Sequence, residues 1–246
     1  MKKRRERAPS QSVNPFRDIY GLADLYPIIG NGKQFISSSP LKYGMYFGKG
    51  RSPVAMLELK EQRTAEGRIL VDAVFDKTMH AEDETNPLTV HSITQAAFQF
   101  DRSITAAKSW TLRRAFYSAG KLMPETAVEK RFTADHQSLR VETSGKTRRI
   151  GLRTPAVPGW ALFLSFETLR KTAEPFRFTL VEDGDSVKED QKILYARTLD
   201  REWNGKPLKL HEFHHTGVGM MPQIYWTNDD GLLLFSWTAL TSWVLQ

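Results

Sequence analysis

Short runs of alternating apolar and polar residues, separated by glycine-containing turns, do most to limit the folds open to this chain of 246 residues. Successive side chains of a β-strand point to opposite faces of the sheet, so alternation gives a strand one buried and one solvated face. The run SLRVET, which begins at Ser138, alternates in this way and leads into Ser144-Gly145, a pair typical of a hairpin turn. We therefore expect a chain built from antiparallel strands.

The same alternation recurs along the chain at the regular spacing of an antiparallel sheet. It predicts strands at 41–47, 54–64, 68–76, 89–101, 108–118, 126–133, 138–144, 146–153, 176–182, 191–199, 207–216, 222–227 and 232–245. The first of these strands is expected at an edge of the sheet. Turns or loops are expected at 66–67, 79–88, 183–185, 204–205 and 228–231, where glycine, proline, asparagine and aspartate gather.

One segment departs from the strand pattern and is predicted to be a helix. Leu162, Phe166 and Leu169 recur at the spacing of one helix face, and two basic residues follow where cations suit the helix dipole. We expect one principal helix near 158–173. Together with the many short strands, this predicts a mainly β fold: a single antiparallel open barrel or half-barrel, with the helix against its concave side.

The charge of the chain is unevenly distributed. Lys and Arg outnumber Asp and Glu by 35 to 28, a formal net charge of +7 that points to a polyanionic partner. Residues 1–7 (MKKRRER) hold +4 of this charge, so the rest of the chain carries only +3. We expect residues 1–12 to be a flexible basic tail and 13–246 to be one β-barrel-like domain. The absence of cysteine excludes disulfides, thiolate metal sites and a cysteine nucleophile.

The segment His211-Glu212-Phe213-His214-His215 matches H-E-x-x-H, which binds zinc when it lies on a helix. The alternation around it predicts a strand instead. In a strand, residues 211 and 215 stand about 13 Å apart at ~3.3 Å per residue, too far to share one zinc ion. We therefore expect no metal site, and we take the three histidines as structural residues or as proton donors and acceptors in a pocket.

Glycine-rich segments do not predict a cofactor site. Gly217-Val218-Gly219 begins like a dinucleotide-binding loop, but Pro222 takes the place of the third glycine and no helix is expected after it. A turn or bulge between strands is the better interpretation. No cofactor is expected.

Aromatic residues gather along the predicted strands and helix, mostly in the C-terminal half. They form core, or they line an apolar cavity, because a barrel of this strand number has room for one ligand. The candidate ligand-binding residues are Trp110, Tyr117, Trp160, Phe178, Tyr195, Phe213, Trp226 and Trp237. The candidate catalytic acid–base residues are His211, His214, His215 and Tyr225.

The closing segment is Gly217-x-Gly219-x-x-Pro222-x-x-Tyr225-Trp226-x-x-Asp229-x-Gly231, followed by an apolar strand. It resembles the end of β-rich bacterial proteins of the lipoprotein-carrier or DUF3108-like type. The resemblance implies a lipocalin-like half-barrel that wraps around a helix and encloses an apolar cavity. No catalytic residues carry over from it, and this chain lacks the export signal of that type.

These observations support three functional hypotheses. The first is binding of a hydrophobic or lipid-like small molecule in the barrel cavity. The second is a cofactor-independent biosynthetic enzyme, of cyclase or isomerase type, acting on a hydrophobic substrate there; the sequence thus leaves enzymatic activity open. The third is polyanion or nucleic-acid binding through the tail and the doublets Arg113-Arg114, Lys130-Arg131 and Arg148-Arg149, which the low charge of the body disfavours.

The sequence also bears on the compartment. No apolar run follows the basic tail, and none in the chain approaches the ~18 residues that a membrane-spanning helix needs. As written, the sequence predicts a cytoplasmic protein without a transmembrane segment, or a periplasmic one if a leader has been removed. The oligomeric state does not follow from the sequence.

Overall fold

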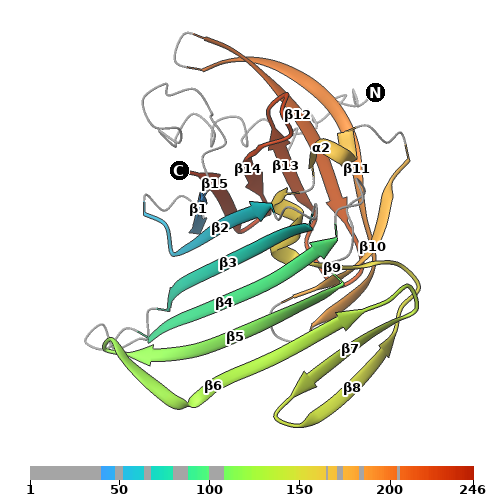
Figure 1. Cartoon of the computed structure of the whole chain (residues 1–246). Coiled ribbons are helices and arrows are strands. Elements are labelled where there is room, and N and C mark those ends of the chain that lie inside the picture. Colours follow the sequence, from blue (N-terminus) through green and yellow to red (C-terminus); the bar gives the residue numbers. More distant parts are fainter. Residues whose placement is uncertain are drawn as a thin grey trace, which may run out of the picture.

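The computed structural model describes residues 40–47, 52–63, 68–79, 88–99, 108–164, 166–170, 174–182, 186–203 and 206–246. These residues form one fifteen-stranded, strongly curved sheet (Figure 1). The sheet is open rather than closed on itself. The predicted mainly β half-barrel is therefore confirmed.

The strands follow the predicted order, with longer β6 and β11 than expected. They are β1 (Leu41–Phe47), β2 (Ala55–Arg63), β3 (Arg68–Met79), β4 (Leu88–Gln99), β5 (Ser109–Ser118), β6 (Lys121–Ala134), β7 (Ser138–Thr143), β8 (Lys146–Gly151), β9 (Ala156–Pro158), β10 (Phe176–Val181), β11 (Val187–Trp203), β12 (Lys206–Thr216), β13 (Gln223–Thr227), β14 (Leu233–Trp237) and β15 (Thr241–Leu245). Their spatial order is β8-β7-β6-β5-β4-β3-β2-β1-β15-β14-β13-β12-β11-β10-β9. Neighbours in this sheet are antiparallel except β9 and β10, which are parallel.

The two edge strands of the sheet follow each other directly in the sequence. β8 ends at Gly151 and β9 begins at Ala156, five residues later. Five residues span at most about 18 Å, so the two edges come at least this close where the chain crosses between them. The sheet thus curls far enough to approach a barrel while it stays open.

Residues in the left-handed backbone region form two of the hairpin turns. Ser144 and Gly145, which join β7 to β8 as predicted, have φ values of 49° and 74°. Ala119 and Gly120 have φ values of 49° and 75° and join β5 to β6. Positive φ at both central residues is the geometry of a type I′ turn, whose twist matches that of the flanking strands.

The single strand predicted at 232–245 is wrong, because the structure has two strands there, β14 and β15. Thr238 Oγ1 accepts hydrogen bonds from the N–H groups of Leu240 (3.3 Å) and Thr241 (3.1 Å) and so stabilises a turn. The segment contains no glycine, proline, asparagine or aspartate. The usual signals of a turn are therefore missing from it.

The prediction of one principal helix near 158–173 is wrong in its extent, because the structure has only two short helical pieces there. Residues Ala156–Pro158 pair with β10, Gly159–Leu164 form the 3-10 helix η2, and Phe166–Arg170 form the short helix α2. Four consecutive residues of η2, Trp160 to Phe163, are buried. A segment enclosed on all sides needs no solvated face, and glycine, tryptophan and phenylalanine are weak helix formers, so a long amphipathic helix does not form.

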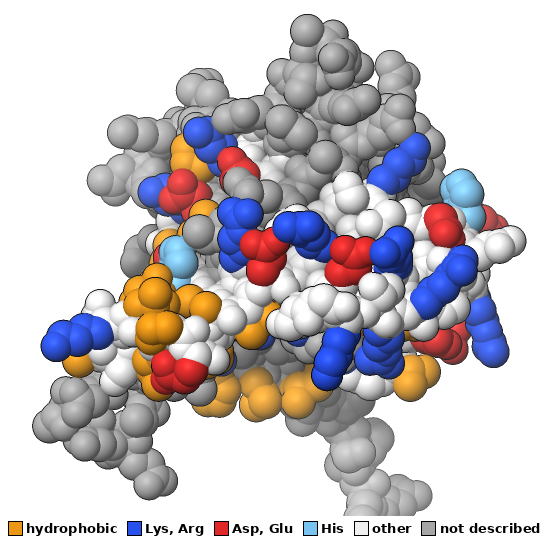
Figure 2. All heavy atoms as spheres, turned by 60° about the horizontal axis from the view of Figure 1, so that its bottom comes forward, with side chains coloured by type: hydrophobic (Ala, Val, Ile, Leu, Met, Phe, Trp, Pro, Cys, Tyr) orange, Lys and Arg blue, Asp and Glu red, His pale blue; other side chains and the backbone are white. Residues whose placement is uncertain are grey.

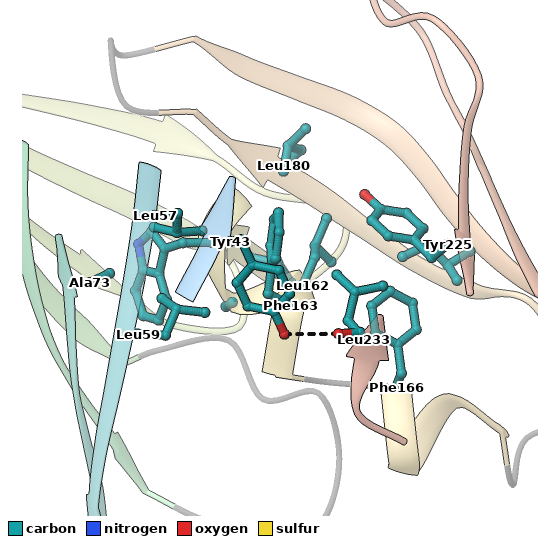
Figure 3. Close-up of a cluster of buried hydrophobic side chains, with 14 of the residues drawn as sticks. Tyr43, Leu57, Leu59, Ala73, Leu162, Phe163, Phe166, Leu180, Tyr225 and Leu233 are labelled. Carbon is teal, nitrogen blue, oxygen red and sulfur yellow. Dashed lines mark hydrogen bonds between the residues drawn. The ribbon is translucent and has the colours of Figure 1, made fainter. Parts of the chain in front are cut away.

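Strand β1 is present as predicted, but its predicted position at an edge is wrong. It lies between β2 and the C-terminal strand β15, with Tyr43 opposite both Leu57 and Leu245. Tyr43 is completely buried, and its hydroxyl donates to the backbone oxygen of Leu233 at 3.1 Å. The concave side of the sheet is filled here by η2, whose Phe163 ring meets the Tyr43 ring edge-on at 5.0 Å (Figure 3).

Several expectations fall on residues outside the described ranges. They are the basic tail 1–12, the loop residues 80–87 and the turns at 66–67, 183–185 and 204–205. Within the described part of the chain, none of the helices has the length and apolar character to cross a membrane.

Candidate functional site

A pocket of about 550 Å³ lies on the concave side of the sheet. Its walls come from strands far apart in the sequence, β2 and β3 on one side and β12 and β13 on the other, with η2 and β15 contributing as well. Figure 3 shows side chains from both sides, Leu57 and Ala73 against Leu180 and Tyr225, around the helical segment. The curvature of the sheet therefore brings the N-terminal and C-terminal halves of the chain to one site.

Aromatic and aliphatic side chains make up most of the pocket wall. Trp243 of β15 is central: its ring lies 5.4 Å from that of Phe163 in η2 and 6.1 Å from that of Phe75 in β3. Strand register explains this grouping, because Phe75 is paired with Leu57, which also lines the pocket. Residues paired across neighbouring strands share one face of the sheet.

Polar groups are concentrated on the β12–β13 side of the pocket. His215 and Gln223 are directly opposite each other in the ladder and both line the pocket, as does Tyr225. Gln223 Nε2 donates to Ser236 Oγ at 3.1 Å. The pocket thus has an apolar side and a side with hydrogen-bonding groups, as ligand sites commonly do.

Gln191 determines the tautomer of His215. Gln191 Nε2 donates to the backbone oxygens of Glu189 (2.7 Å) and Val218 (3.0 Å), which leaves Gln191 Oε1 facing His215 Nε2 at 3.2 Å. Since an amide oxygen only accepts, His215 Nε2 carries the hydrogen and Nδ1 is an acceptor. The Tyr225 hydroxyl, 3.4 Å away, donates to that Nδ1.

Burial keeps both members of the His215–Tyr225 pair uncharged. It lowers the pKa of His215 to about 4, and the nearby charge of Lys188 acts in the same direction. Burial also raises the pKa of the Tyr225 hydroxyl far above its usual range. At pH 7 the pair therefore offers hydrogen-bonding groups without a formal charge.

Gly217 makes room for the Gln191 side chain. A β-carbon at position 217 would overlap the side-chain amide of Gln191. Only glycine lacks that atom, so the residue after β12 has to be glycine for Gln191 to reach His215. This is a close-approach role, and it is distinct from the turn role expected for the glycines of this segment.

Charged residues also reach the pocket. Lys77 of β3 and Glu182, which follows β10, are among the residues that line it. Glu182 forms an ion pair with Lys188, whose Nζ lies 2.8 Å from Glu182 Oε1. Lys77 projects from the same face of β3 as Ala73 and Phe75, at alternate positions along the strand.

His211 belongs to a second polar cluster that does not line this pocket. Its Nε2 lies 2.8 Å from Asp229 Oδ1, and its Nδ1 lies 3.2 Å from the Tyr195 hydroxyl. Arg170 of α2 donates to the backbone oxygen of Asp229 at 2.6 Å and so ties the helix to the β13–β14 turn. The hydrogen bond from His211 is the main cause of a lowered pKa of the Asp229 carboxyl. The arrangement holds the turn in place.

His214 lies on the opposite face of β12 from His211 and His215, together with Glu212. The buried carboxylate of Glu212 accepts from Trp226 Nε1 at 3.1 Å and contacts His214 Nε2 at 2.7 Å and the guanidinium of Arg197 at 3.3 Å. The predicted strand conformation of the H-E-x-x-H segment is confirmed. Among the residues that the structure describes, no three histidine, aspartate or glutamate side chains are grouped to hold a metal ion.

Five of the candidate residues from the sequence line the pocket or pack next to it. Trp160, His215 and Tyr225 line the pocket. Phe178 and Phe213 support it from behind: the Phe178 ring lies 5.2 Å from that of His215, and Phe213 packs against Phe166 of α2 at 5.0 Å.

The remaining aromatic candidates lie away from the pocket. Trp110 stacks on Phe132 at 4.8 Å between β5 and β6, and Tyr117 meets His91 edge-on at 6.2 Å. Tyr195 belongs to the His211 cluster, and Trp226 to the Glu212 cluster. Trp237 is partly buried against the core.

Sequence reasoning missed most of the pocket. Phe75, Lys77 and Gln223, which line the pocket, and Gln191, which contacts His215, carry no motif. Alternation indicates which face of its own strand each residue occupies. It does not indicate which strands of the curved sheet face each other across the concave side, so the grouping of these residues had no sequence signal.

The basic doublets on β5 and β6 belong to a mixed charge pattern. The outward-facing Arg113 and Arg131 both pair with Glu129, at 3.1 Å and 3.0 Å, and these two arginines lower the pKa of its carboxyl. On β7, Arg140 pairs with Glu142 at 2.6 Å. Figure 2 shows acidic and basic side chains mixed over one face of the molecule. Such a pattern gives little of the one-sided positive potential that favours nucleic acid.

Comparisons with known proteins bear on the fold. No protein-family model matches this sequence, and no curated protein matches it. Among solved structures, the chain is similar to the crystal structure of a beta-barrel-like protein of domain of unknown function DUF1849 from Brucella abortus, with a TM-score of 0.56 and 9% sequence identity. The match covers 84% of this chain and 95% of the other. It supports a β-barrel-like fold and does not confirm the lipoprotein-carrier or DUF3108-like resemblance.

Proposed function

We propose that this protein binds a hydrophobic, lipid-like small molecule in the concave pocket. The observation that carries the proposal is the pocket itself, about 550 Å³ between η2 and two distant parts of the sheet. Its volume falls within the ~300–1,000 Å³ of typical small-molecule sites. Apolar side chains line one side, and the His215–Tyr225 pair and Gln223 stand on the other. This division suits a ligand with an apolar body and a polar end.

Transfer of the ligand's apolar part from water to this wall would drive binding. Each buried methylene group contributes about 0.8 kcal/mol. The rings of Phe75, Phe163 and Trp243, which already contact one another, offer a preformed surface for it. Because these rings are positioned before the ligand arrives, little ordering entropy opposes binding.

The electrostatics of the pocket favour binding over catalysis at neutral pH. An efficient general acid or base has a pKa near the working pH. Burial moves the pKa of His215 down to about 4 and that of Tyr225 far up, so neither group is tuned for proton transfer at pH 7. The Tyr225 hydroxyl oxygen, whose hydrogen is donated to His215, is still able to accept a hydrogen bond from a polar group of the ligand.

Titration with N-phenyl-1-naphthylamine, a neutral dye that becomes fluorescent in apolar sites, tests the proposal. We expect saturable binding to the wild type and at least about tenfold weaker binding to Ala73→Phe, because the added ring fills the pocket. Ala127→Phe, at an exposed position of β6, is the matched control and should bind like the wild type. Thermal melting of both variants establishes that they are folded.

The same experiment can contradict the proposal. If the wild type gives no saturable signal, or if folded Ala73→Phe binds as well as the wild type, the dye is not bound in this pocket. Mass spectrometry of molecules that co-purify with the protein provides an independent measurement of its natural ligand.

A further inference from the structure

Lys77 gives the pocket a positive charge, and this charge indicates the chemistry of the ligand. We propose that the ligand is an amphipathic monoanion, a carboxylate attached to an apolar body, and that Lys77 is its counter-ion. This inference rests on the proposed function. The inference specifies the polar end of the ligand, which the apolar wall alone leaves open.

The position of Lys77 is the first support. Lys77 lies on β3, two residues beyond Phe75 and four beyond Ala73, and all three line the pocket. On this face of β3, the apolar side chains of Ala73 and Phe75 are therefore followed directly by the positively charged side chain of Lys77. A lysine can pack its methylene groups along an apolar wall and present its ammonium group at the end.

The second support is that none of the described residues provides a counter-ion for the Lys77 side chain. In the described part of the chain, the Lys77 side chain takes part in neither a hydrogen bond nor an ion pair. The neighbouring Asp76 projects from the other face of β3 and pairs with His91. A carboxylate bound at this wall of the pocket would provide a counter-ion for the ammonium group.

The other charges near the pocket compensate each other. Glu182 lines the pocket, but it is paired with Lys188 at 2.8 Å. Among the described charged residues that line the pocket or pair with one that does, this leaves a single positive charge, that of Lys77, which one negative charge balances. A ligand with one carboxylate fits this balance better than a doubly charged phosphate, and a cationic amphiphile would meet repulsion from Lys77.

The uncharged polar groups are compatible with a carboxylate. Tyr225, His215 and Gln223 lie on the opposite side of the same pocket and place no competing negative charge there. None of the three cancels the charge of Lys77. We therefore expect the preference for an anionic ligand over a neutral or cationic one to depend on Lys77 alone.

Three ligands with the same alkyl chain and different end groups test this inference: dodecanoate, dodecanol and dodecylammonium. Their affinities are measured by displacement of N-phenyl-1-naphthylamine at low ionic strength and at pH 7. We expect dodecanoate to bind the wild type about tenfold more tightly than dodecanol, and dodecylammonium to bind most weakly. Lys77→Met, which keeps an unbranched apolar stem but removes the ammonium group, should bind dodecanoate and dodecanol alike, and Lys77→Arg should restore the preference.

Lys60→Met is the matched control, because Lys60 is exposed on the neighbouring strand β2 and, from its register opposite Asp72, projects from the other face of the sheet. It should keep the full preference for dodecanoate. Equal affinities for dodecanoate and dodecanol in the wild type would overturn the inference while the pocket itself still binds. A preference that survives in Lys77→Met would also overturn it. If the dye and all three ligands fail to bind, the proposed function fails together with the inference.

Discussion

Buried His215 makes the stability of this protein depend on pH in a defined window. In an unfolded chain a histidine has a pKa of about 6.5, and in the folded protein burial lowers the pKa of His215 to about 4. Between these values the unfolded state binds a proton that the folded state does not. The free energy of unfolding therefore rises with pH across this window.

The size of this effect follows from the two pKa values. At ~1.4 kcal/mol per pH unit, a difference between about 6.5 and about 4 corresponds to roughly 3 kcal/mol. The contribution is complete above pH 6.5, decreases as the pH falls, and is lost below about pH 4. Roughly 3 kcal/mol is a large part of the ~5–15 kcal/mol that stabilises a typical folded protein.

Urea denaturation of the wild type and of His215→Gln at several pH values between 4 and 7.5 measures the effect. The difference in free energy of unfolding between the two proteins isolates His215, because both contain every other titrating group. We expect this difference to change with pH by about 1.4 kcal/mol per unit between pH 4.5 and 6 and to be constant above pH 7. His136→Gln, at an exposed position, is the matched control for the loss of a histidine.

A constant difference between the wild type and His215→Gln over the whole range would refute the reasoning. It would mean that His215 has the same pKa in both states. The hydrogen bonds that His215 donates to Gln191 and accepts from Tyr225 would then not hold a neutral imidazole, and the proposed uncharged polar side of the pocket would have to be revised.

Two further substitutions test the packing around the pocket. Gly217→Ala should lower the free energy of unfolding by about 1–3 kcal/mol, because the new methyl group displaces Gln191. A melting temperature equal to that of the wild type would contradict the close approach of Gln191 to position 217. Tyr43→Phe should lower it by about 1–2 kcal/mol, because the buried backbone oxygen of Leu233 loses its hydrogen-bond donor; urea denaturation checks this value, and an unchanged midpoint would contradict it.

Local sequence patterns predicted most of the strands. The hairpin of β7 and β8 follows from the alternation that begins at Ser138 and from the turn at Ser144-Gly145, both of which act between residues close in the chain. Where the local signal is missing, the prediction fails. The turn at Thr238 depends on a side-chain hydroxyl, and no glycine or proline marks it.

The helical segment shows how tertiary packing overrides a helical pattern. The spacing of Leu162, Phe166 and Leu169 matches one helix face, yet Trp160, Ala161 and Phe163 are buried as well. The curved sheet encloses this segment on its concave side, so burial rather than periodicity determines its conformation. The result is a 3-10 turn and a short α-helix instead of one long helix.

The candidate site was only partly accessible from the sequence. The segment around β12 and β13 contains His215 and Tyr225, which line the pocket. Its concentration of histidine and aromatic residues predicted both as candidate site residues. Gln191 is different, because its role depends on two backbone carbonyls and on the missing β-carbon of Gly217. Such contacts between distant residues have no local signature.

The sequence by itself determined the class of this protein: alternation and turn residues act over a few positions, and they are sufficient to specify an antiparallel β chain. Only the tertiary structure decided where β1 lies and which residues share the pocket. Tyr43 meets the C-terminal strand, and Lys77 lines the same pocket as His215, because the sheet curls until its distant strands face each other. That curvature arises from the summed twist and packing of all the strands, so no short segment of the sequence specifies it.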